Sequence, residues 1–199
     1  MWILFITMYD SLKVQSVDSS NVSNYLLGER GFGVIVERSF SGYRIGIAAE
    51  FAGDRDSIIR AINVGISTYQ FSVNYDNTNY RLPYFGFFAD YEVKGILKEG
   101  PMFALYMSGG VGNGEANYVE GDLDFRYMYK YLIGELGLVL GYRIVSTSSL
   151  AIDIYGRGGI GARYLNSNIL ILPDESTEQI KGIKPYISYL IGAKIIQKF

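Results

Sequence analysis

Apolar and polar side chains alternate with a period of two along most of the chain after Gly31. Between Tyr131 and Val145 the even positions are mostly leucine, whereas the odd positions carry Glu135, glycine and Arg143. Successive side chains of a β-strand point to opposite faces, so this pattern is typical of strands with one apolar and one polar face. Because helical periodicity is nearly absent, we predict an all-β fold.

Eight segments carry the alternation and are predicted to be strands. They cover residues 31–40, 43–53, 60–75, 81–97, 101–113, 131–145, 151–164 and 185–199. The domain of residues 31–199 follows a segment, residues 1–30, that we interpret as a leader or periplasmic segment. Its apolar start resembles part of a secretory signal without the basic first region or the cleavage site, and an ordinary apolar N-terminus explains it equally well.

Short connections predict hairpins, at residues 41–42, 98–100 and 146–150. Matching the apolar faces across each hairpin gives a register. The expected pairs include Val36 with Ile47, Val93 with Leu105, and Arg143 with Asp153.

Two longer connections, residues 114–130 and 165–184, lie on one side of this up-and-down order. The connections on the other side are short. Such asymmetry is typical of transmembrane barrels, which have short periplasmic turns and longer external loops.

Alternation alone does not decide which face points into a barrel. A soluble lipocalin-like barrel is apolar inside, and a membrane barrel is apolar outside. The long strands, the aromatic residues near strand ends and the glycine-rich polar face favour the second arrangement. We therefore predict a closed, antiparallel, up-and-down, eight-stranded transmembrane β-barrel.

Thirteen charged residues share the predicted inward face, and their signs nearly balance. They are Glu37, Arg44, Glu50, Asp90, Glu92, Lys94, Glu135, Arg143, Asp153, Arg157, Arg163, Lys194 and Lys198. An ion-conducting lumen and a lumen filled by mutual ion pairs are both compatible with them. Because eight strands leave an interior that side chains just fill, ion pairing is favoured.

Composition removes several classes of function. The chain has no cysteine and no histidine, which excludes disulfides, thiolate sites and histidine-based catalysis. The formal net charge of −2 argues against nucleic-acid binding. We expect no enzymatic activity, no cofactor and no metal site.

With this pattern of strands and faces, residues 31–199 resemble the small eight-stranded outer-membrane proteins of the OmpX and OmpA barrel type. The most specific part is the end of the chain, YISYLIGAKIIQKF, where Phe199 ends an alternating strand. The resemblance implies an outer-membrane location and an assembly signal that involves Gly192 and Phe199, read by the barrel assembly machinery. Gly192 lies further from the end than in the family pattern, and Gln197 replaces an expected apolar residue.

The predicted loop 114–130 combines acidic residues with tyrosines. Its candidate contact residues are Tyr118, Glu120, Asp122, Asp124 and Arg126. The interpretation that we favour is a solvated loop that also extends two strands beyond the membrane. Its aromatic side chains raise the chance of contact with an extracellular protein or surface ligand. We expect a monomer that contacts outer-membrane lipid and acts in envelope structure, adhesion or surface interaction. A narrow pore and a soluble lipocalin-like binding protein are the alternatives.

Overall fold

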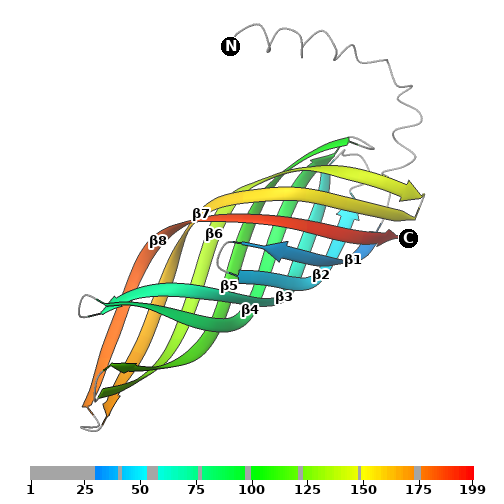
Figure 1. Ribbon diagram of the computed structural model, residues 1–199. Helices are drawn as coiled ribbons and strands as arrows, with labels where there is room; N and C mark the ends of the chain where they lie inside the picture. The colour runs from blue at the N-terminus through cyan, green and yellow to red at the C-terminus, as the bar shows by residue number, and fades with distance from the viewer. Residues whose placement is uncertain are drawn as a thin grey trace, which may run out of the picture.

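The computed structural model describes residues 30–39, 42–52, 58–75, 78–96, 100–120, 123–147, 149–172 and 176–199. Its eight strands are β1 (Arg30–Arg38), β2 (Gly42–Ala52), β3 (Ile58–Tyr75), β4 (Thr78–Ile96), β5 (Gly100–Glu120), β6 (Leu123–Thr147), β7 (Leu150–Leu172) and β8 (Ser176–Lys198). Each strand is antiparallel to the next, and β8 closes the ring on β1 (Figure 1). The predicted eight-stranded barrel is confirmed. Of the predicted leader, only Arg30 falls within the described residues, as the start of β1.

The described residues contain no helix long and apolar enough to cross a membrane.

We call the end of the barrel that carries Arg30 and Phe199 the terminal end, and the opposite end the hairpin end. At the terminal end, the β4–β5 register is as predicted, with Val93 opposite Leu105. Gly100 has a φ of 129°, a conformation that glycine adopts without steric cost. Gly100 is the first residue of β5, so a glycine stands where the chain leaves the predicted hairpin.

The predicted β1–β2 register is wrong by two residues. Val36 lies opposite Ile45 instead of Ile47, and Glu37 lies opposite Arg44. A shift by two residues leaves every side chain on the same face, so matching of apolar faces could not distinguish the two registers. The observed register places opposite charges beside each other inside the barrel.

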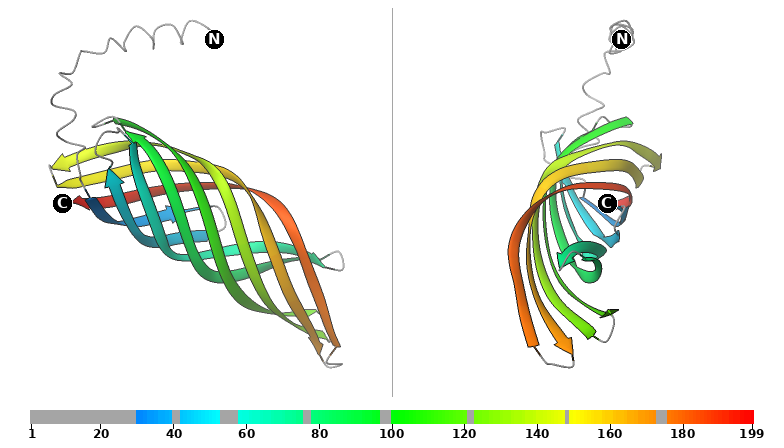
Figure 2. Two further views of the ribbon diagram at one scale, coloured as in Figure 1. Left: turned by 180° about the vertical axis from the view of Figure 1, so that it is seen from behind. Right: turned by 60° about the vertical axis from the view of Figure 1, so that its left-hand side comes forward.

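The two predicted long connections are much shorter than expected, because their described residues belong to strands. The expected extension of two strands through residues 114–130 is seen in β5 and β6, whereas the loop predicted for residues 165–184 is wrong. β5 and β6 continue as a paired hairpin to Glu120 and Leu123, and β7 and β8 continue to Leu172 and Ser176. Figure 2 shows these four strands extending well beyond the β1–β2 hairpin. The asymmetry between the two ends of the barrel therefore comes from strand length.

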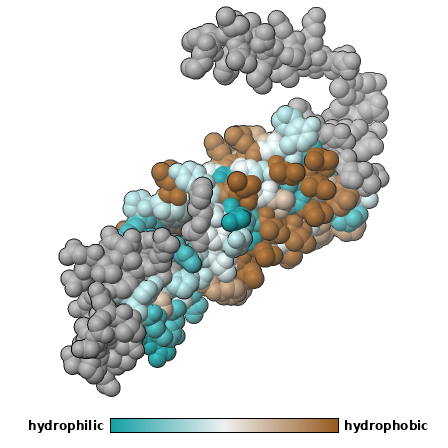
Figure 3. Space-filling view, in the orientation of Figure 1, coloured by the Kyte–Doolittle hydropathy of each residue, from teal (hydrophilic) through white to brown (hydrophobic). Residues whose placement is uncertain are grey.

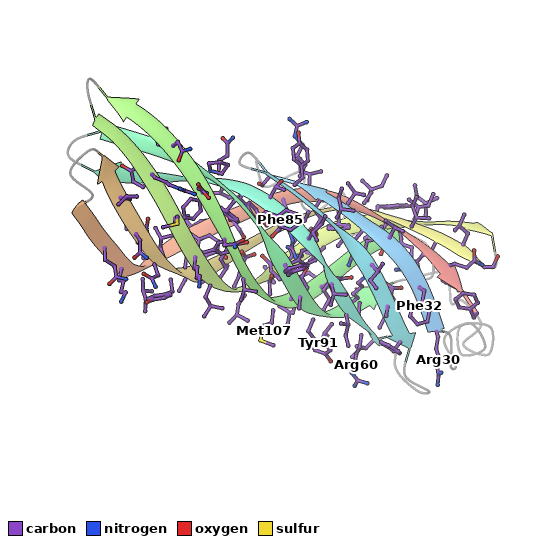
Figure 4. All side chains as sticks on the ribbon, turned by 90° about the horizontal axis from the view of Figure 1, so that it is seen from below. Arg30, Phe32, Arg60, Phe85, Tyr91 and Met107 are labelled. Atoms are coloured by element: carbon purple, nitrogen blue, oxygen red, sulfur yellow. The ribbon has the colours of Figure 1, made fainter. Side chains whose placement is uncertain are left out.

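The barrel is apolar outside and charged inside. Leu138, Leu140 and Ile191 point outward with exposed fractions of 46%, 62% and 74%, whereas Glu92 and Lys94 point inward and are fully buried. Figure 3 shows the hydrophobic surface concentrated on the half of the barrel nearer the terminal end, and Figure 4 shows Tyr91 and Met107 pointing away from the wall. This is the reverse of a soluble lipocalin-like barrel, so that alternative is wrong.

Aromatic side chains surround the terminal end. Phe32, Phe51, Phe103, Tyr142 and Phe199 all point outward and are exposed. The rings of Phe32 and Phe199, from the first and last strands, lie 6.3 Å apart between centroids. Such a belt is typical of the interfacial girdle of a membrane barrel.

When paired residues are followed from strand to strand around the ring, each pair lies closer to the hairpin end than the one before. From Gly31 the ladder passes through Glu50, Ala61, Glu92, Tyr106, Gly137, Gly159 and Ser188. In the β1–β8 register, Gly31 pairs with Lys198 and Arg38 pairs with Ile191. Continued in the same register, Ser188 would lie opposite position 41, which is ten residues beyond Gly31. β1 ends at Arg38. In the described registers, the part of β8 that precedes Ile191 therefore has no partner on β1.

The β1–β2 hairpin ends within the apolar band of the exterior. The paired positions rise by ten residues over eight strands. To stay at one height along the barrel axis, a path around the ring must therefore move about one residue toward the terminal end at each strand. Starting at Arg38, such a path passes near Leu136 on β6 and Leu190 on β8. Apolar outward side chains continue beyond this level to Leu132 and Ile183. The wall beside β8 is thus incomplete at a level where the exterior is still apolar.

Replacement of Leu138 by arginine should destabilise the barrel. Leu138 points outward near the middle of β6. Arginine at the bilayer midplane costs roughly 2–4 kcal/mol in barrels of this kind. We expect a loss of this size in the free energy of unfolding, measured by urea titration in phospholipid vesicles.

Asn117→Arg is the matched control, because Asn117 points outward on β5 beyond the apolar band. It should change stability by about 0–1 kcal/mol. Arginine at Gly42, at the start of β2, cannot serve as this control, because a Cβ there would overlap the backbone carbonyl of Thr68. Equal stabilities of the Leu138 and Asn117 variants would contradict the lipid-facing assignment.

Candidate functional site

The thirteen charged residues predicted to face the lumen all lie on the inward faces of their strands. Eleven are buried, and Arg163 and Lys198 are partly exposed. Ten of the buried residues form two clusters of ion pairs. The eleventh, Glu135, belongs to neither cluster.

The cluster nearer the terminal end contains three acids and three bases, and we call it the sextet. Its members are Glu50, Glu92, Asp153, Lys94, Arg143 and Lys194. The Nζ atom of Lys94 lies 2.5 Å from Glu50, 3.5 Å from Glu92 and 3.4 Å from Asp153. The six side chains come from β2, β4, β6, β7 and β8, so their pairing extends across the lumen.

Arg143 and Asp153 form the ion pair expected from the predicted β6–β7 register. The two residues are direct partners across the ladder. Arg143 donates from Nε to Asp153 Oδ1 at 2.6 Å and from Nη2 to Oδ2 at 2.8 Å. Two parallel hydrogen bonds of this kind make the pair strong and directional. Arg143 also donates to Glu50 at 2.9 Å, which connects the pair to the rest of the sextet.

The second cluster has two acids and two arginines, and we call it the quartet. Its members are Glu37, Asp90, Arg44 and Arg157. Each carboxylate pairs with both arginines, at 2.7 Å for Asp90 and 3.2 Å for Glu37. The sextet and the quartet each have a formal charge of zero.

Aromatic rings cover the two arginines of the quartet. The Cζ atoms of Arg44 and Arg157 each lie 3.7 Å from a ring centroid, that of Phe88 and that of Tyr106, respectively. Cation–π contacts are stronger where water is excluded. The ring contacts therefore stabilise the two guanidinium groups in the narrow interior, in addition to the two carboxylates of the quartet.

Tyr155 completes the quartet, and sequence reasoning missed it. Its hydroxyl donates to Glu37 at 2.9 Å. Tyr155 lies between Asp153 and Arg157 in the alternation, so its inward direction was visible in the sequence. The contact of Tyr155 with Glu37 could not be predicted from the sequence, because the two residues come from β7 and β1, which are far apart in the chain.

Glu135 is held by two tyrosines. Tyr106 and Tyr186 both donate to its carboxylate, the latter at 2.8 Å. Gly159 and Gly161 on the facing strand β7 make room for these rings, since a Cβ on either glycine would overlap Tyr106 or Tyr186. Glycine and tyrosine thus pack together on the inward face. From the sequence, only the high content of both residue types was visible.

A cluster of buried residues fills the lumen on the hairpin side of Glu135. We call it the tyrosine cluster: Tyr84, Tyr127, Tyr129, Tyr131, Leu165 and Ile169. The rings of Tyr84 and Tyr131 lie 4.1 Å apart between centroids. The three tyrosines of β6 share the odd-numbered face of Glu135, so the same alternation would have identified them.

The two predicted surface-loop side chains that the structure describes, those of Tyr118 and Arg126, lie on strands and point to opposite faces. Tyr118 points inward from β5 and packs edge-on against Tyr127, with 5.7 Å between centroids. Arg126 points outward from β6 and donates to Glu115 at 2.7 Å. Three further predicted side chains lie outside the described part of the structure: Glu120, Asp122 and Asp124.

The residues of the predicted assembly signal have different surroundings. Gly192 is buried inside the barrel, where a Cβ would approach Tyr155 and Glu37 to 2.8 Å. Phe199 is exposed at the outer edge of the terminal end. Phe199 is therefore available for contact from outside the barrel, whereas Gly192 makes room for packing.

Within the described residues, no group of three or more histidine, cysteine, aspartate or glutamate side chains could hold a metal ion. The lumen carboxylates instead pair with cations and tyrosine hydroxyls.

Removal of one member of the Arg143–Asp153 pair should destabilise the barrel. Asp153→Ala leaves Arg143 and Lys94 with excess positive charge inside the sextet, and an uncompensated buried charge costs roughly 3–5 kcal/mol. Arg143→Ala should have a similar cost. The double variant restores neutrality, so its loss should be well below the sum in a urea titration in micelles.

The exposed pair of Glu115 and Arg126 provides the control. Its removal should cost about 0–1 kcal/mol, since water screens both charges. Strictly additive losses for Asp153→Ala and Arg143→Ala would mean that the two charges do not interact.

No protein-family model matches this chain, and no curated protein matches its sequence. Among solved structures, it is similar to a major outer membrane protein from Thermus thermophilus, with 13% identity, a TM-score of 0.48, and coverage of 85% of this chain and 99% of that one. Neisserial surface protein A gives 12% identity, a TM-score of 0.36, and coverage of 86% and 95%. The Escherichia coli outer membrane protein W gives 9% identity, a TM-score of 0.34, and coverage of 84% and 97%.

Proposed function

We propose that this chain is an outer-membrane protein of a Gram-negative-type envelope that catalyses no reaction, conducts no ions and acts through the surface of its hairpin end. The observation that carries the proposal is the combination of an apolar exterior with a lumen filled by ion pairs. The exterior favours lipid, and the filled lumen leaves the outer surface of the hairpin end as the part that meets other molecules.

The distribution of side chains supports a location in the membrane. Outward isoleucine, leucine and phenylalanine side chains form a continuous band, and aromatic residues border it at the terminal end. Strands β3 to β8 have 18 to 25 residues, more than the 9–11 that a tilted strand needs to cross a bilayer. In water this band would be an aggregation-prone surface.

The lumen argues against the alternative of a narrow pore. Sextet and quartet side chains meet from opposite walls, and each cluster is neutral and buried. A conducting path would have to break several of these pairs. Eight strands enclose little space beyond that occupied by side chains.

The extension of β5 to β8 is suited to contact with other molecules. Its outward face is polar beyond the apolar band and includes Asn113, Glu115, Asn117, Arg126, Lys130, Asn168, Gln179 and Lys181. In the described registers, β5 has no β4 partner beyond Asn113, and β8 has no β1 partner before Ile191. Unpaired strand edges can accept a strand from another protein. We infer a role in envelope structure, adhesion or surface interaction.

Assembly of such a protein requires recognition of its last strand. Phe199 is exposed and lies beside Phe32 of the first strand, at the place where the ring closes. We propose that the barrel assembly machinery contacts Phe199. We also propose a monomer, because the ring closes within one chain.

Cysteine labelling should reveal the orientation of the barrel. The chain has no cysteine, so Asn117→Cys and Ser149→Cys each introduce a single thiol, one on the extension and one at the terminal-end turn between β6 and β7. A membrane-impermeant maleimide should label the Asn117 variant on intact cells. The Ser149 variant should react only after the outer membrane is permeabilised, and the opposite pattern would contradict the proposed surface role.

The purified protein should show no stable single-channel current in a planar bilayer, because the sextet and the quartet occupy the lumen. Heat-modifiable mobility on a gel verifies that the reconstituted protein is folded. A reproducible current from folded protein would contradict the filled lumen and favour the pore.

A further inference from the structure

A cavity of about 290 Å³ lies between the quartet and the tyrosine cluster. Arg44 and Phe88 line it toward the terminal end, and Tyr84 and Tyr131 line it toward the hairpin end. Its volume is at the lower end of the range for small-molecule sites. It can hold one slender group but not a complete two-chain lipid.

The cavity opens through the side of the barrel. Ser188 lines it from the inward face of β8, but so do Ile187 and Tyr189, which point outward. A cavity lined by both faces of one strand reaches past the edge of that strand. Ser39, the residue that follows β1, lines the cavity as well. Here β8 has no β1 partner in the described registers, because β1 ends at Arg38.

The opening lies within the apolar band. Ile187 and Tyr189 have exposed fractions of 65% and 60%, and the apolar exterior continues beyond them to Ile183. If the band is embedded in lipid, as the proposed function requires, the cavity is accessible from the hydrocarbon layer. A ligand arriving by this route must itself be largely apolar.

Two charged side chains line the cavity, Arg44 and Glu135, and Arg44 is paired with Glu37 and Asp90 in the quartet. The two recorded hydrogen bonds of Glu135 come from Tyr106 and Tyr186. A carboxylate has about four acceptor positions, so it can accept further donors. The quartet that borders the cavity is neutral. The remaining lining is rich in tyrosine, whose ring faces attract cations.

We propose that this cavity is a lateral binding site for a single-chain amphiphile with a cationic, hydrogen-bond-donating head group, such as an alkylammonium. The head group donates to Glu135 among the tyrosines. The alkyl chain leaves between β8 and Ser39, the residue that follows β1, and continues into the bilayer. The early end of β1 provides the opening of this site, and Glu135, which belongs to neither ion-pair cluster, provides its polar end.

An anionic amphiphile is the rival ligand, and its binding would overturn the proposal. Arg163 faces the lumen opposite Ile133, one inward position farther toward the hairpin end than Glu135. If Arg163 determined the preference, a carboxylate head group would bind better than an ammonium. The sign of the preference therefore distinguishes the two residues.

The test uses the full chain in phosphatidylcholine nanodiscs with a photoreactive alkylammonium of twelve carbons. After illumination, mass spectrometry should locate crosslinks in residues 186–190 or at Ser39. Dodecylammonium should compete at a concentration about tenfold lower than dodecanoate, the difference expected from one nearby charge of partly screened strength. Glu135→Gln keeps the side-chain shape and should abolish this preference.

Ser188→Phe should block the opening and reduce crosslinking severalfold, because Ser188 lines the cavity at the β8 edge. Ser149→Phe introduces the same group at the terminal-end turn and should leave crosslinking unchanged. Folded, inserted protein without crosslinks in the cavity, or with a preference for dodecanoate, would overturn the binding site and leave the proposed function intact. Failure of the folded protein to enter nanodiscs would overturn both, and heat-modifiable mobility separates this case from misfolding of a variant.

Discussion

Charge neutrality in a narrow interior is the constraint on which the rest of this barrel depends. Ten charged side chains are buried in two clusters within a ring of eight strands, and an unpaired charge there would be far more costly than in water. The structure resolves this by pairing residues from strands that are distant in the sequence, as when Lys94 of β4 meets Asp153 of β7. Each cluster is separately neutral, so neither depends on the other for compensation.

The same constraint explains what sequence reasoning could and could not predict. Alternation placed each lumen charge on the correct face, and it yielded the Arg143–Asp153 pair because their strands are neighbours in the chain. It failed for the first hairpin because a two-residue shift preserves the faces. Only the opposition of Glu37 and Arg44, a matter of charge, separates the two registers.

The length of β5 to β8 was underestimated because the alternation on their extension has a different composition. In the membrane band, leucine and isoleucine outside contrast clearly with charge and glycine inside. On the extension of β6, Tyr127 and Tyr129 point inward, while Met128 and Lys130 point outward. Tyrosine is readily interpreted as a loop residue when it stands among acids and asparagines. Its true neighbours are glycines on adjacent strands, as where Gly114 of β5 makes room for Tyr129.

A ten-residue climb of the ladder and a nine-residue first strand together produce the incomplete wall. In a ring with this climb, β8 can be paired along its whole length only if β1 continues well beyond Arg38. The chain ends β1 early, and the described side chains that line the cavity at the gap are mainly Glu135, tyrosines and serines, with Arg44 of the quartet at the border toward the terminal end. The sextet lies nearer the terminal end, where the ring is complete. The quartet lies at the border of the gap, with Glu37 on the last paired stretch of β1. The end of β1 therefore coincides with the change, inside the barrel, from ion-pair clusters to packed tyrosines.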